Sequence, residues 1–340
     1  MVTLASIAKE LGVSRATVSL VLNGREKHAR ISEDTAEKVR SYCRKLNYLP
    51  NIHAQRMTLE VVRNIMVFLN MTNGVAPESS FYDYNVTRIL GGVASVADQA
   101  KFTFVIRLYR PEMDEVEIFD AFRNRDIDGM LYYGMTMPKS WIQTFVTERR
   151  RVVGIGTKPG VLPSVNIDNR EISRELTNRL LAQGRRKFVY LCGTTESYPG
   201  AERYLGFRDA LEAAGVPFQE KTQCFQGDFQ IDKAKAIAKR LLARKNGLPD
   251  AVVCANDSMA VGFLQAFQAA GVKVPDEVAV AGGDNIDLCE FVQPPLATFD
   301  NRPFDLGKTA CQTLLKLIDN KTLKNKNLTL KSKILMRKSL

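Results

Sequence analysis

The sequence predicts a small all-α unit at the N-terminus, followed by a larger α/β unit with two parallel-sheet lobes. Apolar residues recur at helical spacing before about residue 49, whereas strand-length apolar runs alternate with amphipathic helical stretches beyond about residue 61. Such alternation is typical of parallel sheets covered on both faces. Residues 61–340 are too many for one sheet of this kind, so two similar lobes are the economical arrangement.

The composition limits the class of protein. With 340 residues, of which 45% are hydrophobic, the chain is long enough to bury a large core in more than one domain. No apolar run is long enough to span a membrane, and the N-terminus lacks the apolar core of a secretory signal. We therefore expect a cytoplasmic protein.

Charge and cysteine usage give two further expectations. The 48 Lys and Arg against 37 Asp and Glu give a formal net charge of +11, which favours a polyanionic partner. No C-x-x-C pair occurs among the six cysteines, which favours reduced, mostly buried thiols over a disulfide framework or a zinc site. The cysteines are Cys43, Cys192, Cys224, Cys254, Cys289 and Cys311.

The first segment has the pattern of a short amphipathic helix. Apolar residues recur at i, i+3, i+4 and i+7 from Leu4 to Leu11, and Thr3 is placed to cap the first turn. Gly12 then ends the helix, since glycine enters the left-handed conformation at little cost.

Two more helices follow. Ser14 can cap a helix whose buried face is Val18, Val21 and Leu22, and Ser32 can cap a third helix. The third helix carries an apolar stripe that supports the other two: Val39, Tyr42, Cys43 and Leu46. Two short helices that cross at a steep angle against a third form a helix-turn-helix headpiece.

The outward face of the second helix is suited to the major groove of DNA. Arg15 can fork onto a guanine edge, whereas Ala16 or Leu20 can meet a thymine methyl group. A three-helix bundle with a solvated polar face is the alternative interpretation. The candidate DNA contacts of this segment are Ser14, Arg15, Ala16, Thr17, Ser19, Leu20 and Asn23.

The charge of the N-terminal part supports the same interpretation. Residues 1–63 contain eleven Lys and Arg but six Asp and Glu. The basic residues are Lys9, Arg15, Arg25, Lys27, Arg30, Lys38, Arg40, Arg44, Lys45, Arg56 and Arg63; the acidic ones are Glu10, Glu26, Glu33, Asp34, Glu37 and Glu60.

The larger unit contains seven clear strand candidates and three clear helices between them. The predicted strands are NIMVFLN (64–70), FTFVIRL (102–108), DGMLYYG (128–134), RVVGIG (151–156), FVYLCG (188–193), DAVVCAN (250–256) and EVAVAGG (277–283). The predicted helices lie at 169–184, 201–215 and 232–247. The basic segment LTLKSKILMRKS (328–339) reads as a strand with its turn, and its charge as a solvated edge.

The segments LASIAKELGVSRATVSLVLNG and KLNYLPNIHAQRM resemble the headpiece and hinge of the LacI/GalR family of bacterial transcription regulators. This resemblance covers nearly the whole chain. It implies a hinge that folds on DNA after the Tyr-x-Pro element, here Tyr48 and Pro50, and wedges an apolar side chain into the central base step. Met57 takes the place of the usual leucine, and His53 stands where an apolar residue is usual.

The resemblance also implies the domain organisation. Residues 1–49 form the helix-turn-helix headpiece, 50–60 the hinge helix, and 61–340 an α/β effector and dimerisation domain of periplasmic-binding-protein type. The implied N-lobe comprises 61–160 and 292–322, and the implied C-lobe 161–291 and 323–340. Because no heptad tail follows, a homodimer on a near-palindromic operator is expected.

Four motifs of the family indicate residues that bind the effector. ERYLGF places Arg203 toward the ligand, GGDN supplies Asp284 as an acceptor for hydroxyl protons, and Phe229 in QGDF provides an aromatic plate. In ANDSMAVG, Asn256 is expected to face the ligand, whereas Asp257 is expected to cap the following helix.

Tyr133, at the end of DGMLYY, is a further candidate for the effector site, with a buried strand end as the alternative. A guanidinium that donates two hydrogen bonds, a carboxylate and an aromatic ring together favour a mono- or disaccharide as the effector. A stretch of Tyr82, Asp83 and Tyr84 resembles members that respond to galactosides, whereas Ser197 and Pro199 disfavour a purine.

The alternatives are a sugar-binding receptor or a sugar-processing enzyme without a role in gene regulation. The only histidines are His28 and His53, so residues 61–340 lack a Ser-His-Asp or Cys-His arrangement and a histidine metal site. No P-loop is present, and GIGTKPG has the wrong spacing for a dinucleotide loop. We therefore expect no enzyme activity, no cofactor and no metal.

Overall fold

The structure is a computed structural model of the 340-residue chain. It describes residues 3–22, 24, 26–27, 29–48, 61–70, 83–110, 113–134, 136–194, 196–244 and 247–340. The chain divides into two units, the headpiece and an effector domain that begins at Arg63. Of the predicted hinge, Pro50 and the segment from His53 to Met57 lie outside the described residues.

The headpiece contains three helices: α1 (Leu4–Glu10), α2 (Arg15–Leu22) and α3 (Glu33–Lys45). Each begins where the sequence offers a cap. Thr3 and Ser6 form a capping box on α1, the Ser14 hydroxyl accepts from the Thr17 amide at 3.0 Å, and Ser32 accepts from the Thr35 amide at 3.3 Å.

The headpiece core is built from the predicted stripes. The fully buried members are Ile7, Ala8, Val18, Val21, Ala36, Val39 and Cys43. Leu22 and Tyr42 pack against this core while partly exposed. Leu46, predicted to belong to the stripe, is 37% exposed because it caps the C-terminal end of α3 instead of lying within a helical turn.

The N-lobe of the effector domain is a six-stranded parallel sheet in the order β11-β5-β4-β3-β1-β2. β1 lies next to the edge strand β2 and pairs with it, Ile65 opposite Phe104, and with β3, Ile65 opposite Gly129. The strands are β1 (Asn64–Asn70), β2 (Thr103–Tyr109), β3 (Gly129–Tyr133), β4 (Val152–Ile155), β5 (Ser164–Ile167) and β11 (Asn327–Leu330). The helices are α5 (Tyr84–Gln99), α6 (Glu115–Arg123), α7 (Lys139–Thr147) and α14 (Pro303–Ile318).

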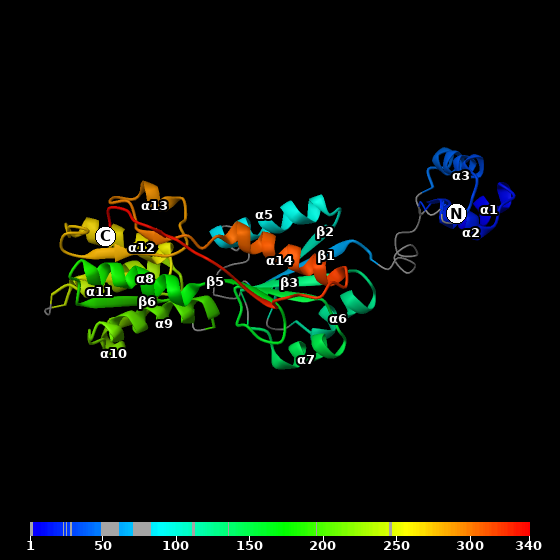
Figure 1. The fold of residues 1–340 in the computed structure, drawn as a ribbon. Coiled ribbons are helices and arrows are strands. Elements are labelled where there is room, and N and C mark those ends of the chain that lie inside the picture. The colour runs from blue at the N-terminus through cyan, green and yellow to red at the C-terminus, as the bar shows by residue number, and fades with distance from the viewer. Residues whose placement is uncertain are drawn as a thin grey trace. The chain divides into compact units, whose positions relative to one another are not determined.

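Helices cover both faces of this sheet (Figure 1). On one face α5 packs on α14 through two glycines: a Cβ on Gly92 would lie 2.1 Å from the Phe304 oxygen, and one on Gly307 would lie 2.1 Å from the Ile89 oxygen. On the other face, α6 and α7 enclose an aromatic core that includes Phe68, Trp141 and Phe145.

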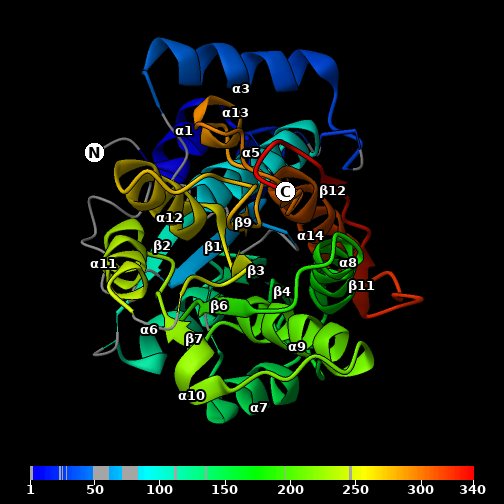
Figure 2. The same cartoon turned by 90° about the vertical axis from the view of Figure 1, so that its left-hand side faces the viewer.

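The C-lobe is a four-stranded parallel sheet in the order β7-β6-β8-β9, with α8 packed on α9 and α11 packed on α12 (Figure 2). The register places Phe188 opposite Ala251 and Tyr190 opposite Cys224. The strands are β6 (Phe188–Cys192), β7 (Cys224–Gln226), β8 (Ala251–Cys254) and β9 (Ala279–Ala281). The helices are α8 (Asn169–Ala182), α9 (Tyr198–Ala213), α10 (Glu220–Gln223), α11 (Ile231–Leu242), α12 (Asp257–Ala269) and α13 (Leu288–Phe291).

The chain crosses between the lobes later than the sequence predicted. β5 and β11 belong to the N-lobe sheet, so the crossings follow Ile167 and Leu330 and do not lie near residues 161 and 323. The short antiparallel pair β10 (Thr298–Phe299) and β12 (Ile334–Leu335) extends the C-lobe. Because bridges join Ala281 to Ala297 and Asp284 to Asp300, residues 292–300 lie with the C-lobe and not, as predicted, with the N-lobe.

The last crossing is visible in Figure 1, where the red terminal segment runs from the N-lobe sheet to the C-lobe. Among the described residues, no helix has the length and apolar character needed to cross a membrane.

Candidate functional site

The predicted DNA-binding face lies on α2. Arg15 and Ala16 are exposed, whereas Ser19 and Leu20 are half-buried. Because Val18 and Val21 point into the core, the exposed side of this helix is free of the residues that hold the headpiece together. An exposed arginine and a small apolar residue at adjacent positions have the size and chemistry to contact base edges.

Three other predicted DNA contacts have structural roles in the headpiece. The Ser14 hydroxyl caps α2 and lies 2.9 Å from the Thr17 hydroxyl, so these two groups first hold the start of the helix. Tyr48 packs against the headpiece core, and its amide donates to the Cys43 carbonyl at 2.9 Å. Asn23 and Met57 lie outside the described residues.

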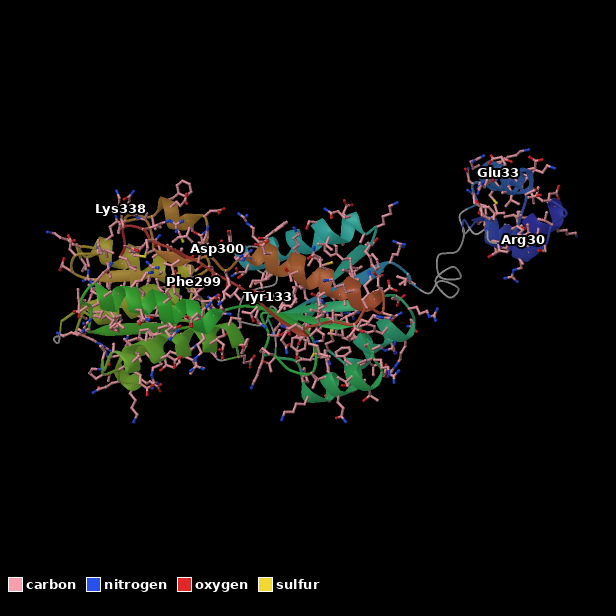
Figure 3. All side chains as sticks on the ribbon, in the orientation of Figure 1. Arg30, Glu33, Tyr133, Phe299, Asp300 and Lys338 are labelled. Carbon is pink, nitrogen blue, oxygen red and sulfur yellow. The ribbon has the colours of Figure 1, made fainter. Side chains whose placement is uncertain are left out.

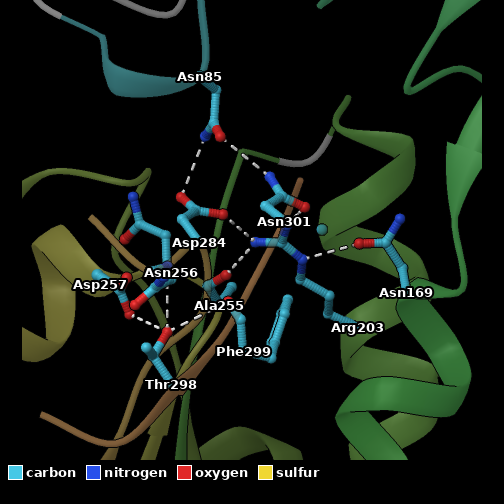
Figure 4. A network of polar contacts seen from close by, with 12 residues as sticks. Asn85, Asn169, Arg203, Ala255, Asn256, Asp257, Asp284, Thr298, Phe299 and Asn301 are labelled. Carbon is cyan, nitrogen blue, oxygen red and sulfur yellow. Dashed lines mark hydrogen bonds and ion pairs between the residues drawn. The ribbon is translucent and has the colours of Figure 1, made fainter. Parts of the chain in front are cut away.

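Arg203 is the centre of the polar network in the C-lobe (Figure 4). It lies in the second turn of α9 and is 4% exposed. Its Nε donates to Asn169 Oδ1 at 2.9 Å, Nη1 to the Ala255 carbonyl at 2.5 Å, and Nη2 to Asn301 Oδ1 at 2.9 Å. The guanidinium also lies 4.9 Å from the centre of the Phe299 ring, a cation–π contact.

Asp284 is the anionic partner of Arg203. Its Oδ1 lies 3.1 Å from Arg203 Nη1, and the residue is 5% exposed. Burial raises the pKa of Asp284 to about 7, against the lowering effect of Arg203. Within the described residues, Oδ1 of Asp284 accepts no hydrogen bond of good geometry. A buried acceptor beside a cation is therefore available to a hydroxyl group.

The backbone of Asp284 is held in an unusual conformation. Its φ is 123°, a region that favours glycine, and the amide donates to the Phe299 carbonyl at 2.9 Å. Strained residues of this kind cluster at functional sites, where surrounding contacts hold them in place.

Two asparagines join this ion pair to the N-lobe. Asn85, in the first turn of α5, donates through Nδ2 to Asp284 Oδ2 at 3.2 Å. Asn301 donates through Nδ2 to Asn85 Oδ1 at 3.1 Å and accepts from Arg203. A chain of four side chains thus connects the two lobes, and a ligand that takes the Arg203 fork competes with Asp284 and Asn301.

The cap of α12 is Asn256, whereas the sequence predicted Asp257 in this role. Asn256 caps α12, because its Oδ1 accepts from the Met259 amide at 3.1 Å. Asp257 is fully buried, and accepts from the Thr298 hydroxyl at 2.6 Å and from the Ile286 amide at 3.0 Å. The prediction that Asp257 is the cap is wrong, since it already lies in the first turn.

The two aromatic candidates lie on different lobes. Phe229 is half-buried in the loop after β7, and its ring lies directly over Gly193, where a Cβ would be 1.9 Å from Cζ. Tyr133 is half-buried at the end of β3, on the side of the N-lobe sheet that faces the C-lobe (Figure 3). Burial raises the pKa of its phenol, and Asp83 and Asp284 raise it further.

The structure therefore brings Arg203 and Asp284 into contact. Asn256 follows β8, and Asp284 follows β9, the neighbour of β8 in the sheet. The guanidinium of Arg203 lies over the Phe299 ring, and not over the predicted aromatic plate Phe229. Sequence reasoning missed Asn85, Asn169 and Asn301, because isolated asparagines carry no spacing signal. The sequence of residues 163–167 also gave no clear strand signal, although β5 lies there and leads into α8, the helix that holds Asn169.

A surface depression of about 590 Å³ lies near the starts of α8 and α9, and Asn169, a partner of Arg203, is one of its lining residues. Four of its charged groups form two ion pairs, Arg170 with Asp209 at 2.6 Å and Arg174 with Glu171 at 2.8 Å. It contains none of the predicted effector residues, and its ion pairs are exposed, so the Arg203 network is the better candidate.

The comparisons with known proteins agree with both halves of this description. Residues 3–51 match the family described as bacterial regulatory proteins, lacI family, and residues 177–340 match a periplasmic-binding-protein-like domain. The chain is 31% identical over 331 residues to the HTH-type transcriptional repressor PurR of Vibrio parahaemolyticus, covering 94% of this chain and 93% of that protein.

Two solved structures have the same fold over nearly the whole chain. A complex of the transcriptional regulator CelR with cellobiose is 27% identical and covers 100% of both chains, with a TM-score of 0.73. The lac repressor dimer bound to operator and an anti-inducer is 23% identical and covers 99% of this chain and 98% of that one, with a TM-score of 0.82. With its helix-turn-helix and its two-lobed α/β domain, the chain belongs to the lacI family of bacterial regulatory proteins and is a DNA-binding transcriptional regulator.

Proposed function

We propose that this regulator is a repressor that binds a near-palindromic operator as a homodimer and whose operator affinity is controlled by a small sugar. The observation that carries the sugar assignment is the buried Asp284 Oδ1, which lies 3.1 Å from Arg203 Nη1 but accepts no hydrogen bond of good geometry within the described part of the chain. A sugar hydroxyl both donates and accepts, so it matches a carboxylate and a guanidinium side by side. That the related CelR structure holds cellobiose supports this ligand class.

The link between the lobes supplies the allosteric step. Asn85 and Asn301 join the Arg203–Asp284 pair to α5 of the N-lobe. A ligand that changes these contacts favours one arrangement of the lobes over another, in proportion to its differential affinity for the two. We propose that this shift alters the spacing of the two hinges in the dimer.

On DNA, the two headpieces would each place α2 in the major groove. Arg15 would read a guanine, Ala16 and Leu20 would contact base methyl groups, and Met57 would enter the central step from the minor groove. These roles rest on the exposed positions of Arg15 and Ala16, on the half-buried Leu20 beside them on α2, and on the family resemblance of the hinge.

We further propose that the effector domain binds and releases its sugar unchanged, in the cytoplasm where the operator is. The relatives described above are transcription regulators, which supports binding without turnover. A panel of mono- and disaccharides, incubated with the protein and analysed by chromatography, should be recovered intact. Hydrolysis or oxidation of one sugar would instead favour a sugar-processing enzyme.

The experiment that tests the proposal starts with selection of bound duplexes from a randomised DNA pool at near-physiological salt, which suppresses general attraction to phosphate. Calorimetry then measures binding of cellobiose and other sugars to the wild type, to Asp284→Asn and to the exposed control Asp319→Asn. We expect a two-fold symmetric site, and a sugar whose affinity falls at least tenfold in Asp284→Asn alone. Equal affinities in the two variants would place the sugar elsewhere.

A further inference from the structure

Two cysteines of the C-lobe lie together although they are far apart in the sequence. Cys192 ends β6 and Cys224 begins β7, and these parallel strands are neighbours in the sheet. Their Sγ atoms are 3.0 Å apart, and both residues are half-buried. The sequence spacing favoured isolated thiols, but strand pairing brings this pair within reach of a bond.

The local structure can accommodate the small movement that a bond requires. β7 is an edge strand of three residues, preceded by the single-turn helix α10. An edge strand is held by a partner on one side only, so it shifts at lower cost than a central strand. The sulfur atoms need to approach by about 1 Å to reach the S–S bond length of about 2 Å.

The two thiols are not equivalent. The hydrogen bond from Cys192 to Cys224 lowers the pKa of Cys224 and raises that of Cys192. The Arg208 charge and a hydrogen bond from Tyr204 also favour the Cys224 thiolate, against the effects of burial and Glu220. Cys224 is therefore the sulfur that attacks first, since the thiolate is the reactive form.

Hydrogen bonds connect the end of β6, which carries Cys192, to the loop that carries Phe229. The Gly227 amide donates to the Cys192 carbonyl at 3.0 Å, and the Gln226 side chain donates to the Gly193 carbonyl. The Phe229 ring in turn lies over Gly193. A shift of β7 along β6 therefore displaces residues 226–229 relative to the end of β6.

We propose that Cys192 and Cys224 are a redox modification site, which forms a reversible disulfide with a peroxide as oxidant and repositions the loop that carries Phe229. The Cys224 thiolate attacks one peroxide oxygen, the O–O bond breaks, and a sulfenic acid and hydroxide form; the hydroxide becomes water by taking a proton. Cys192 then attacks the sulfenic sulfur, the S–O bond breaks, and a second water leaves with the Cys192 proton. Two thiols and one peroxide thus give one disulfide and two waters, and a dithiol reverses the reaction.

Peptide mapping of the full chain tests the bond itself. The protein is treated with one equivalent of hydrogen peroxide, alkylated and digested with trypsin, which releases residues 188–203 and 222–233 as the peptides of interest. We expect these two peptides to be joined, and to separate again after treatment with dithiothreitol. Cysteines that stay separate, or that advance individually to sulfinic acid, would overturn the proposal.

Variants add a matched control. Cys224→Ser and Cys192→Ser remove one sulfur of the pair, whereas Cys311→Ser removes a fully buried thiol of α14 that has no sulfur partner in the described residues. Peroxide should oxidise Cys192 and Cys224 to a disulfide in Cys311→Ser but not in the other two. If a variant fails to fold, the wild-type mapping still decides.

The effect on the ligand site rests on the proposed function and has its own readout. Calorimetry compares the affinity of reduced and oxidised protein for cellobiose, or for whichever sugar binds the wild type in the test of the proposed function. We expect the affinity to change at least fivefold on oxidation and to recover with dithiothreitol. A disulfide that leaves the affinity unchanged would overturn the link to Phe229. If reduced protein binds no sugar, the proposed function fails, while the mapped disulfide stands.

Discussion

Arg203 and Asp284 form a buried ion pair at 3.1 Å, and each is also hydrogen-bonded to an asparagine that leads to the N-lobe. The guanidinium donates to Asn301, the carboxylate accepts from Asn85, and these two asparagines are bonded to each other. One small cycle of side chains therefore holds the candidate ligand site and the contact between lobes. The candidate ligand site and the contact between the lobes therefore share side chains.

Removal of the Arg203 charge should destabilise the effector domain. Arg203→Met leaves Asp284 buried without its cation and breaks the bonds to Asn169 and Asn301, at an expected cost of about 3 kcal/mol. Arg174→Met, which removes one side of the exposed pair with Glu171, should cost less than about 1 kcal/mol. Denaturant unfolding of the two variants measures the difference. Similar losses would mean that the Arg203 network contributes no more than a surface pair.

The stability of the effector domain should depend on pH around neutrality. The pKa of Asp284 is raised by burial to about 7 in the folded protein, above its unfolded value of 3.8. The folded state therefore binds a proton that the unfolded state does not, so this contribution is present below pH 4 and is lost as the pH rises through 7. Tm measured from pH 5 to 8 should fall with pH in the wild type more steeply than in Asp284→Asn. Equal slopes would contradict the raised pKa.

Gly193 should be essential for the position of Phe229. A Cβ at residue 193 would lie 1.9 Å from Phe229 Cζ, so Gly193→Ala must displace the ring. Gly160→Ala is a suitable control, because its nearest atom would be 4.0 Å away and its backbone is not strained. We expect sugar affinity to fall about tenfold in Gly193→Ala only, which is about 1.4 kcal/mol. Unchanged affinity would remove Phe229 from the site.

Asn85 should carry the response to sugar from the C-lobe to the N-lobe. Asn85→Ala removes the bonds to Asp284 and Asn301 but leaves the Arg203–Asp284 pair in place. The variant should still bind sugar, whereas the effect of sugar on operator affinity should fall at least fivefold. Asn325→Ala, whose exposed side chain bonds only to the backbone of Asn327 in the described residues, is the control. A full sugar response in Asn85→Ala would exclude this route.

Arg15 should decide sequence recognition by the headpiece. Loss of a bidentate guanine contact costs about 1–3 kcal/mol and relaxes specificity at one base pair. Arg15→Ala should therefore weaken operator binding about tenfold or more, and it should bind operators with that base pair changed equally well. Lys38→Ala, on the exposed side of α3, should change affinity little. If both variants lose affinity equally for every sequence, Arg15 contacts phosphate only.

Local rules predicted the elements that depend on neighbouring residues. Thr3, Ser14 and Ser32 cap their helices as expected, because a cap requires only the amides that follow it. The strand at 64–70 was also predicted at its observed bounds, since six of its seven residues are buried. Periodicity is a strong signal where one element is long and its burial is uniform.

Features set by distant contacts could not be predicted in this way. β5 has only four residues, and its buried polar side chains donate to groups outside the strand: the Ser164 hydroxyl to Asn327 Oδ1, and Asn166 Nδ2 to the Thr157 carbonyl. Because so short and polar a strand gives little signal in the sequence, the crossings between the lobes were predicted too early in the chain. The Arg203 and Asp284 motifs indicated two residues that the structure brings into contact, but their asparagine partners lie on other elements and carry no motif. Asn256 and Asp257 are adjacent and both residue types can cap a helix, so the sequence alone does not resolve which of them caps α12.

The central claim is that a ligand at the Arg203–Asp284 pair controls affinity for DNA. The direct test is a fluorescence anisotropy titration of the selected operator, at fixed salt, with and without saturating sugar. We expect the sugar to change the operator Kd by about 5–150-fold, the range typical of allosteric coupling, and to have no such effect in Asp284→Asn. An operator Kd that is the same with and without bound sugar would contradict the account.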